Sequence, residues 1–491
     1  MITKKSKRAL LVTLLVIAVA AGALLIAAVF SRIGVKAADG SAPLLFTENI
    51  FVILILALLL PVSIIFLMVH VMKRHRSFSN YWIDKCTDNK EMDSSDVSVG
   101  FDLQDVGVVG GSGIGGKKDD GFFADGEEFE ESGSRFYMLE KTDREMARRE
   151  EPVYDSEADL ERICEQFRSF AASRMGLYYD ITDIRRFVAG MAVTHILIMQ
   201  GMSGTGKTSL AYAFGEFLSN PSVIVPIQPM WKEKSDLMGY YNEFTKRFNE
   251  TVLLQKMYEA NYTDDMYITV LDEMNIARVE YYFAEFLSLL ELPNPESRRI
   301  EVVSDEWKSD PKLLRNGQLK LPENMWFVGT ANNDDSTFAI SDKVYDRAMV
   351  MNLDKKTEVF DAPYTKGMRV SQTRWKQLVS EAKEEYGLTS RSLRKIKKLD
   401  SYMIEKCNIT FGNRIMKQIK EYVPVYVACG GEESAAIDEI LSRKVMRKLE
   451  SQNPIYVKKI AEEFCNYIDD VFGTDKMPLC KEAIRNIARN A

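Results

Sequence analysis

A glycine-rich loop in the middle of the chain carries the residue types best suited to chemistry. Its residues are Gly201, Met202, Ser203, Gly204, Thr205, Gly206, Lys207, Thr208 and Ser209. Glycines let successive backbone N–H groups converge on phosphate oxygens at the start of a helix. A lysine at this position reaches the β- and γ-phosphates of a nucleotide, and the hydroxyl of Thr208 is placed to ligate Mg²⁺. The loop therefore predicts a site for a nucleoside triphosphate and magnesium.

A second group of candidate residues ends an apolar stretch that begins at Met266. The stretch finishes in Asp272 and Glu273. In a parallel sheet, ligands bind beyond the carboxyl ends of the strands, so Asp272 would join the magnesium shell. Glu273 would then polarise the attacking water. The alternative is a strand followed by an acidic helix start, which the helix dipole favours.

A third apolar stretch, Met325 to Thr330, is followed by Asn332. A polar side chain at the carboxyl end of such a strand can hydrogen-bond the γ-phosphate or the water. A loop-forming asparagine is the alternative. Together the candidates place phosphate, metal and water chemistry at one edge of a sheet.

The elements that must position these residues are visible as apolar patterns. Residues 194–199 form a short continuous apolar run, typical of a buried parallel strand, and residues 209–218 have helical spacing. Helices are also predicted over 155–173 and 181–191. The fold class expected is α/β, a parallel sheet flanked by helices. Beyond Asp354 the pattern is wholly helical, with segments at 371–386, 390–407, 413–427, 434–449, 455–472 and 477–490.

Two long apolar runs near the amino terminus predict a transmembrane hairpin within residues 1–76. They cover residues 9–30 and 50–71, each long enough to span a hydrocarbon core of about 30 Å. Lysine and arginine flank the hairpin on its outer sides, so the positive-inside rule places both ends in the cytoplasm. A cleaved signal peptide is the alternative for the first run. The prediction is a cell-membrane protein with two spans and a cytoplasmic remainder.

Residues 77–150 are polar, rich in glycine and then acidic, which predicts a flexible linker with one short helix near residues 138–149. The net charge of −7 argues against a generally basic nucleic-acid surface, although a local patch stays open. The six cysteines show no CxxC pair, and with three histidines neither a zinc site nor a histidine-based triad is predicted.

The three strand ends, in this order and spacing, resemble an AAA+ ATPase with a P-loop core. The stretch from Leu271 to Arg278, the segment 236–241 after Trp231, and Gly329 to Asn332 resemble the McrB-like branch, near the dynein and MoxR ATPases. The resemblance implies a nucleotide-binding core over 151–354 and a helical lid with an extension over 355–491. It also implies a hairpin insertion within residues 292–322.

The resemblance also assigns roles by position. Asn332 corresponds to sensor 1, and Arg347 corresponds to the arginine finger that completes the site of a neighbouring subunit. Arg391 resembles sensor 2, with Arg394 as the rival candidate. A surface salt bridge is the alternative for each arginine. A homo-oligomeric ring, most simply a hexamer, follows from the trans finger.

The chain also departs from the McrB pattern, because a single arginine replaces the expected run around the finger, and a membrane hairpin stands where a DNA-reading domain is expected. We therefore expect an ATP hydrolase that remodels a protein partner at the cytoplasmic membrane face. The alternatives are an NTP-driven DNA translocase with a defence role and a nucleotide-dependent scaffold. ATP is the default nucleotide, with GTP as the alternative.

Overall fold

The computed structural model describes residues 134–332 and 337–489. They belong to the second of two compact units, which runs from Leu103 to Ala491. Within these described ranges, no helix is long and apolar enough to cross a membrane. The predicted spans, residues 9–30 and 50–71, and the linker up to residue 133 lie outside the described residues.

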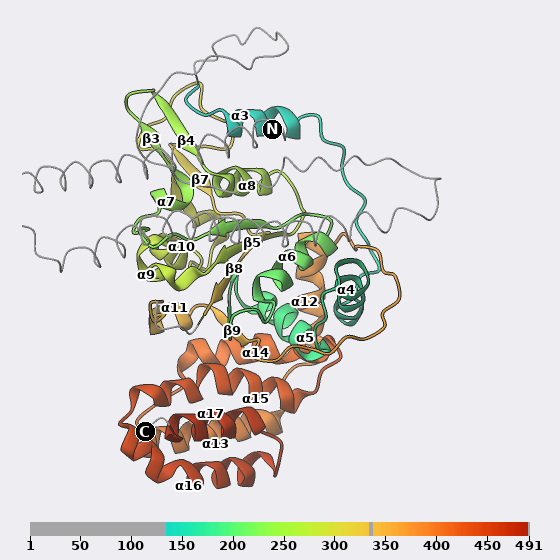
Figure 1. Ribbon diagram of the computed structural model, residues 1–491, viewed down its shortest axis with the longest axis vertical. Helices are drawn as coiled ribbons and strands as arrows, with labels where there is room; N and C mark the ends of the chain where they lie inside the picture. The colour runs from blue at the N-terminus through green and yellow to red at the C-terminus, as the bar shows by residue number, and fades with distance from the viewer. Residues whose placement is uncertain (1–133, 333–336, 490–491) are drawn as a thin grey trace, which may run out of the picture. The chain divides into compact units, whose positions relative to one another are not determined.

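A five-stranded parallel sheet forms the centre of the described unit (Figure 1). Its order is β2–β5–β8–β1–β9, so β1 lies between β8 and β9. The strands are β1 (Ile196–Gln200), β2 (Val223–Pro226), β5 (Tyr267–Asp272), β8 (Met325–Ala331) and β9 (Met349–Asn352). All pairs in this sheet are parallel. The predicted α/β class and the three predicted strands are confirmed.

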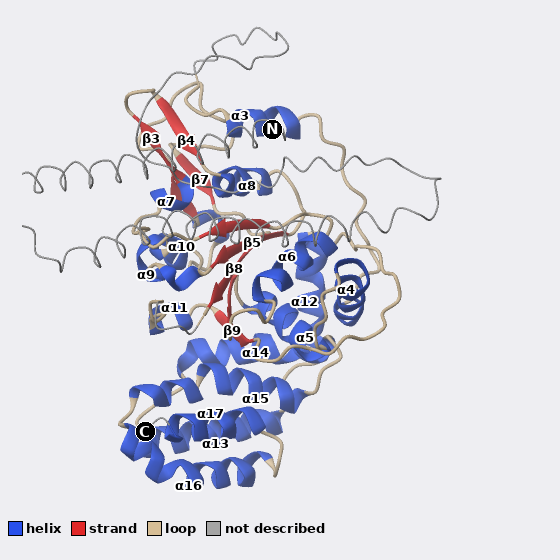
Figure 2. Cartoon of the chain, in the orientation of Figure 1, coloured by secondary structure: helices blue, strands red, loops and turns tan. Residues whose placement is uncertain are grey.

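Helices cover both faces of the sheet, because successive strand side chains point to opposite sides. Leu197 and Met199 of β1 enter one buried cluster, whereas Ile196 and Ile198 enter a second. The first cluster involves α4 (Leu160–Met175), α5 (Ile181–Val193) and α6 (Lys207–Phe217). The second involves α8 (Val252–Ala260), α9 (Val279–Tyr282), α10 (Ala284–Leu289) and α11 (Asp342–Tyr345). Figure 2 shows the strands between these two layers.

Two antiparallel hairpins are inserted into this core. β3 (Gly239–Asn242) pairs with β4 (Arg247–Glu250) after the short helix α7 (Ser235–Met238). β6 (Arg299–Glu301) pairs with β7 (Gln318–Lys320) after the 3₁₀ turn η2 (Pro295–Ser297). The second hairpin confirms the insertion expected within residues 292–322.

Residues 134–149, which the sequence assigned to the linker, are packed against the rest of the described unit. Helix α3 (Met138–Met146) matches the short helix expected there. The carboxylate of Glu250 accepts three hydrogen bonds from backbone N–H groups at the start of α3. Buried Arg135 donates to Asp305 and to both carboxylate oxygens of Asp310. These contacts attach α3 to both inserted hairpin regions.

The carboxyl-terminal part is helical, as predicted. Its helices are α12 (Gln372–Glu385), α13 (Ser390–Cys407), α14 (Gly412–Ala428), α15 (Glu433–Lys444), α16 (Pro454–Phe472) and α17 (Pro478–Arg489). The fourth predicted helix ends early, and the 3₁₀ helix η3 (Met446–Ser451) follows it. Helix α14 packs against α5 and α12, which joins the helical part to the sheet-bearing core (Figure 1).

Candidate functional site: a nucleotide site and a distant arginine

The phosphate loop joins β1 to α6, as the sequence predicted. Residues Gly201–Gly206 connect the strand to a helix that begins at Lys207. Gly201 has φ of +139°, and the carbonyl oxygen of Leu353 occupies the space a side chain would need. Gly206 has φ of +93° as the residue before the helix. The loop therefore requires glycine at both of its ends, and its turn aims the first N–H groups of α6 outward.

Lys207 lies at the centre of this loop and is buried. Its Nζ donates to the carbonyl oxygens of Gly201 at 2.9 Å and Met202 at 2.8 Å. The Thr205 hydroxyl donates to the Met202 carbonyl oxygen at 3.0 Å. The loop thus wraps around the ammonium group, which holds a positive charge where phosphate oxygens would bind.

The metal-binding candidates are in direct contact. The Thr208 hydroxyl donates to Oδ1 of Asp272 at 2.7 Å, so α6 and β5 meet at this point. Mg²⁺ is commonly held by one or two protein oxygens together with phosphates and waters. The described residues contain no cluster of three or more acidic, histidine or cysteine side chains that could hold a metal alone. Thr208 and Asp272 supply two adjacent oxygens, so they suit Mg²⁺ that is also bound by the phosphates of a nucleotide.

Thr330 is a site residue that sequence reasoning missed. Its hydroxyl donates to Oδ1 of Asp272 at 2.9 Å and accepts the backbone N–H of Glu273 at 2.9 Å. The signal that could have found it is strand register, because Leu271 pairs with Gly329 and so sets Thr330 beside Asp272. Thr330 fixes the orientation of both acidic residues.

Glu273 has an unusual backbone conformation for a residue other than glycine, with φ of 52° and ψ of 47°. Such left-handed residues are uncommon and often mark functional sites. The turn ends β5 sharply, and the Glu273 side chain is exposed at the carboxyl edge of the sheet. That position suits a carboxylate that must reach a water molecule next to bound phosphate.

Asn332 follows β8 at the same edge of the sheet and is the last described residue before residue 337. Its carbonyl oxygen accepts bonds from Asn275 Nδ2 at 2.9 Å and from the Thr337 hydroxyl at 3.1 Å. Asn275 also accepts the Phe338 backbone N–H at its own carbonyl oxygen, at 2.8 Å. Asn275, which no sequence pattern marks as a site residue, therefore links the Asp272–Glu273 turn to the segment that carries Asn332.

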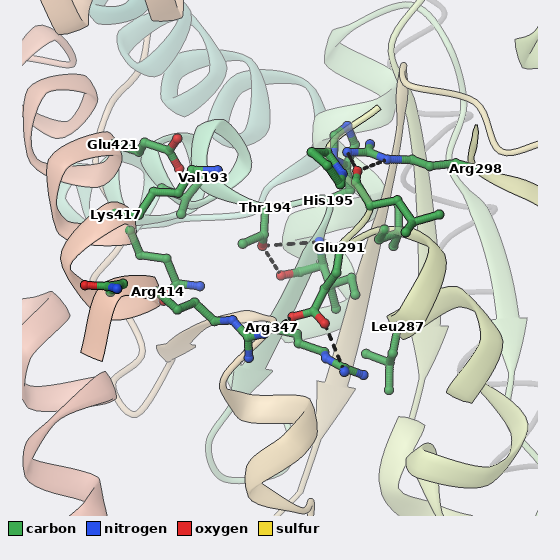
Figure 3. A pocket seen from close by; sticks show the side chains of 16 residues that line it. Val193, Thr194, His195, Leu287, Glu291, Arg298, Arg347, Arg414, Lys417 and Glu421 are labelled. Carbon is green, nitrogen blue, oxygen red and sulfur yellow. Dashed lines mark hydrogen bonds and ion pairs between the residues drawn. The ribbon is translucent and has the colours of Figure 1, made fainter. Parts of the chain in front are cut away.

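Arg347 lies at the opposite edge of the sheet. It precedes β9, whose first residue, Met349, pairs with Leu197, whereas the phosphate loop begins after Gln200. The four residues of β9 rise about 13 Å between those edges. The Arg347 guanidinium pairs with Glu291 at 2.9 Å (Figure 3). The structure therefore does not bring Arg347 to the nucleotide site of its own chain.

The segment around Arg347 is held by residues of the helical part. Lys444 of α15 donates to the carbonyl oxygens of Tyr345 at 2.6 Å and of Ala348. Gln418 of α14 donates to the carbonyl oxygen of Asp346 at 3.2 Å. Burial lowers the pKa of Lys444 to about 7.

Arg391 and Arg394 stand apart from all of these groups. Both are exposed in the first turns of α13, which packs against α16. Arg394 donates to the Ser390 carbonyl oxygen at 3.2 Å, whereas the side chain of Arg391 has no hydrogen bond or ion pair with another described residue. The sensor 2 role stays a prediction for either arginine.

Comparisons with known proteins agree with this geometry. Residues 196–348 match the family model of an AAA domain of the dynein-related subfamily. Residues 365–491 match a domain of unknown function, DUF8727. No curated protein matches the chain.

Solved structures with similarity to the chain include two bacterial proteins. One is a predicted ATPase from Cytophaga hutchinsonii, with 12% identity, 62% of this chain and 93% of that chain covered, and a TM-score of 0.43. The other is NtrX from Brucella abortus, with 12% identity, 62% and 67% covered, and a TM-score of 0.23.

The family match spans β1, the phosphate loop, Asp272, Glu273, Asn332 and Arg347. The resemblance to the McrB-like part of the branch stays a prediction. Residues 196–348, which match the model of the dynein-related AAA domain, carry the glycine-rich phosphate loop at one edge of the sheet and an arginine at the other, an arrangement that supports an AAA+ ATPase.

Proposed function

We propose that the chain hydrolyses ATP as a ring of identical subunits, most simply a hexamer, with each nucleotide bound between two neighbours. The observation that carries this proposal is the separation of the two edges of the sheet. Lys207, Thr208 and Asp272 lie at the carboxyl edge, whereas Arg347 lies beyond the amino end of β9. A second copy of the chain would supply the arginine that this copy cannot supply to itself.

Within such a site the chain's own residues divide the work. The loop N–H groups and Lys207 would hold the β- and γ-phosphates. Thr208 and Asp272, which are in contact, would hold Mg²⁺. When bound, the metal neutralises charge on the phosphate oxygens. Glu273 accepts a proton from the water that attacks the γ-phosphorus, and ADP leaves. Asn332 orients that water, and the neighbour's Arg347 stabilises charge on the transferring phosphoryl group.

We propose further that the ring is anchored to the cytoplasmic face of a membrane and remodels a protein partner there. The apolar runs at residues 9–30 and 50–71 support the anchor. The turn between β3 and β4 supports the proposal that a partner protein binds, because Phe244 at that turn is 99% exposed. Tyr240 on the same hairpin is also exposed, and exposed apolar groups that gather on one surface mark contact sites more often than single ones do.

The test of hydrolysis uses the full-length chain in detergent, with ATP turnover measured over a range of protein concentrations. Turnover per subunit should rise with concentration as neighbours assemble. The Glu273→Gln variant should lose about 10²-fold or more in turnover while it keeps nucleotide affinity, because a general base contributes that much. Glu301→Gln, an exposed change on β6, is the control. Wild-type turnover in Glu273→Gln would remove Glu273 from this role, and GTP in parallel assays fixes the base preference.

Three further measurements test the biological role. Flotation with lipid vesicles should recover the full-length chain and should fail after removal of residues 1–76. Membrane proteins that co-purify with Glu273→Gln and are released on ATP addition to the wild type would support remodelling. Stimulation of turnover by duplex DNA, lost at higher salt, would instead support DNA translocation.

A further inference from the structure

The hairpin of β3 and β4 has one covered face and one exposed face. On the covered face Tyr241 lies opposite Phe248, whose ring stacks on Phe136 with ring centres 5.1 Å apart. Tyr240 and Arg247 point to the other face, because side chains alternate along each strand. Tyr240 is 55% exposed, and the Arg247 guanidinium has no ion pair with another described residue. An aromatic ring and an unpaired cation therefore share a face that the described part of the chain leaves open.

The turn of the hairpin extends this face. Phe244 at the turn is the 99% exposed residue, and Lys246 beside it is exposed as well. Lys246 pairs with Glu243 at 3.0 Å, but both side chains are in solvent, where such a pair contributes little. We call Tyr240, Phe244, Lys246 and Arg247 the hairpin surface. Two aromatic rings and two cations suit a ligand segment that carries aromatic and acidic side chains together.

The sequence has a segment of that composition immediately before the described residues. Residues 119–131 contain seven aspartates and glutamates and three phenylalanines, and no lysine or arginine. Two residues separate this segment from Ser134, the first described residue. Since a chain extends by at most about 3.6 Å per residue, Glu131 lies within about 11 Å of Ser134. The segment is therefore always within reach of the hairpin.

The first described residues approach the hairpin in a direction that favours this contact. The backbone N–H of Phe248 donates to the carbonyl oxygen of Arg135 at 2.8 Å. Two residues further along both segments, the backbone N–H of Tyr137 donates to the Glu250 carboxylate at 2.7 Å. The chain thus runs alongside β4 in the same direction. With the same offset, residues upstream of the described range would meet the cations of the hairpin surface and then its turn.

We propose that residues 119–131 bind the hairpin surface of the same subunit and cover it. The carboxylates would pair with Lys246 and Arg247, and the phenylalanines would pack on Tyr240 and Phe244. Because the segment is tethered beside the hairpin, its effective concentration there is on the order of mM, so a weak contact is sufficient.

The contact would regulate access to the surface where the proposed function places the partner, and this consequence rests on that function. A partner has to displace the segment from the same aromatic and cationic groups. The inference therefore also names the class of partner, a protein that presents an extended acidic segment with aromatic side chains.

The test measures binding of a fluorescent peptide, with the sequence of residues 117–133, to the full-length chain in detergent. A variant that lacks residues 119–131 should bind the peptide. The wild type should bind it at least about 10-fold more weakly, because its own tethered segment fills the surface. Binding to the deletion variant should weaken between about 0.1 M and 1 M salt, since the screening length falls from about 10 Å to about 3 Å. Fluorescence anisotropy gives each dissociation constant.

Substitutions in the deletion variant locate the contact. Phe244→Ser and Arg247→Ser should each weaken peptide binding by about 10-fold, the loss typical of a residue at the centre of a contact. Ile455→Ser and Lys398→Ser, exposed changes in the helical part, are the matched controls and should leave binding unchanged. A peptide with serine at its three phenylalanine positions should also bind about 10-fold more weakly. Equal binding of the two peptides would overturn the aromatic contact.

The other outcomes separate this inference from the proposed function. The inference is overturned if the deletion variant does not bind the peptide, if the wild type binds it equally well, or if both hairpin substitutions have no effect. If the wild type gains peptide binding on dilution, the segment of a second copy covers the surface, and the contact within one subunit is wrong. If the peptide binds as expected but the deletion recovers no additional membrane proteins, the contact stands and the remodelling role fails.

Discussion

The two edges of the central sheet are built in different ways. At the carboxyl edge, Lys207 and Thr208 are adjacent at the start of α6, and Asp272 at the end of β5 accepts a 2.7 Å hydrogen bond from Thr208. At the amino edge, Arg347 depends on Glu291 before it in sequence and on Gln418 and Lys444 far after it. The first edge binds ligand with local groups, whereas the second is held by long-range tertiary contacts. A substitution at the carboxyl edge should therefore change nucleotide affinity, whereas one at the amino edge should change turnover of the assembled protein.

The largest expected effect is at the amino edge. Arg347→Ala should lower turnover of the assembled protein by about 10³-fold or more, because arginine fingers contribute 10³–10⁵ in rate. Nucleotide affinity of the dilute protein should stay at the wild-type value. Turnover assays and binding titrations with a fluorescent ATP analogue measure the two quantities, with Arg144→Ala as the control. Equal loss of affinity and turnover would mean that the two edges are not separate sites.

The counterpart at the carboxyl edge is Lys207→Ala. It should weaken nucleotide binding by about 10- to 100-fold at any protein concentration, because it removes a charged donor to phosphate. The same titration measures this loss. Lys256→Ala, a change on α8 away from the loop, serves as the control. An affinity loss that occurs only in assembled protein would contradict a locally built site.

Thr330→Val tests how the acidic residues of the carboxyl edge are positioned. The substitution keeps the side-chain shape but removes the hydroxyl between Asp272 and the Glu273 N–H. We expect turnover to fall by about 3- to 10-fold, the worth of a neutral hydrogen bond, with affinity nearly unchanged. Steady-state kinetics separate the two parameters. A fall in affinity alone would place Thr330 in phosphate binding instead of catalytic positioning.

The last expected effect is a pH dependence of folding stability at the amino edge. The unfolded chain keeps the Lys444 proton up to its ordinary pKa of 10.5, whereas burial lowers the folded pKa to about 7. The unfolded state binds more protons between these values, so stability should rise with pH across that interval. The rise is at most about 1.4 kcal/mol per pH unit from one group. Lys444→Met should lack this component.

Chemical denaturation at several pH values measures that component as the difference between wild type and variant. Lys420→Met is the control, because its ammonium group is exposed on α14. A wild-type profile that runs parallel to the Lys444→Met profile would mean that Lys444 stays charged in the folded protein.

The carboxyl edge could be predicted from the sequence because its chemistry is carried by local patterns. A glycine-rich loop after an apolar run, and acids at the end of another, need only the rule that parallel strands end together. Thr330 was not predicted as a site residue, because its role depends on the register between β5 and β8. Asn275 was not predicted either, because its hydrogen bonds are with Asn332 and Phe338, which are distant in sequence.

The amino edge could be predicted only in part. The finger position of Arg347 followed from resemblance, but the contacts that Gln418 and Lys444 make with this segment depend on how α14 and α15 pack against the core. No local pattern encodes such packing. The packing of residues 134–149 was also not predicted, because their composition is polar and their contacts are with Glu250, Asp305 and Asp310 elsewhere in the chain.

The buried Arg135 has a mechanical consequence. It lies at the start of the described chain and binds Asp305 and Asp310, while its guanidinium stacks 4.4 Å from the centre of the Trp307 ring. A pulling force applied upstream of Ser134 would thus load the segment between β6 and β7 first, through a desolvated ion pair. The strands of the central sheet would bear that load only later. The nucleotide site is in this sense insulated from tension that enters through the amino-terminal side of the chain.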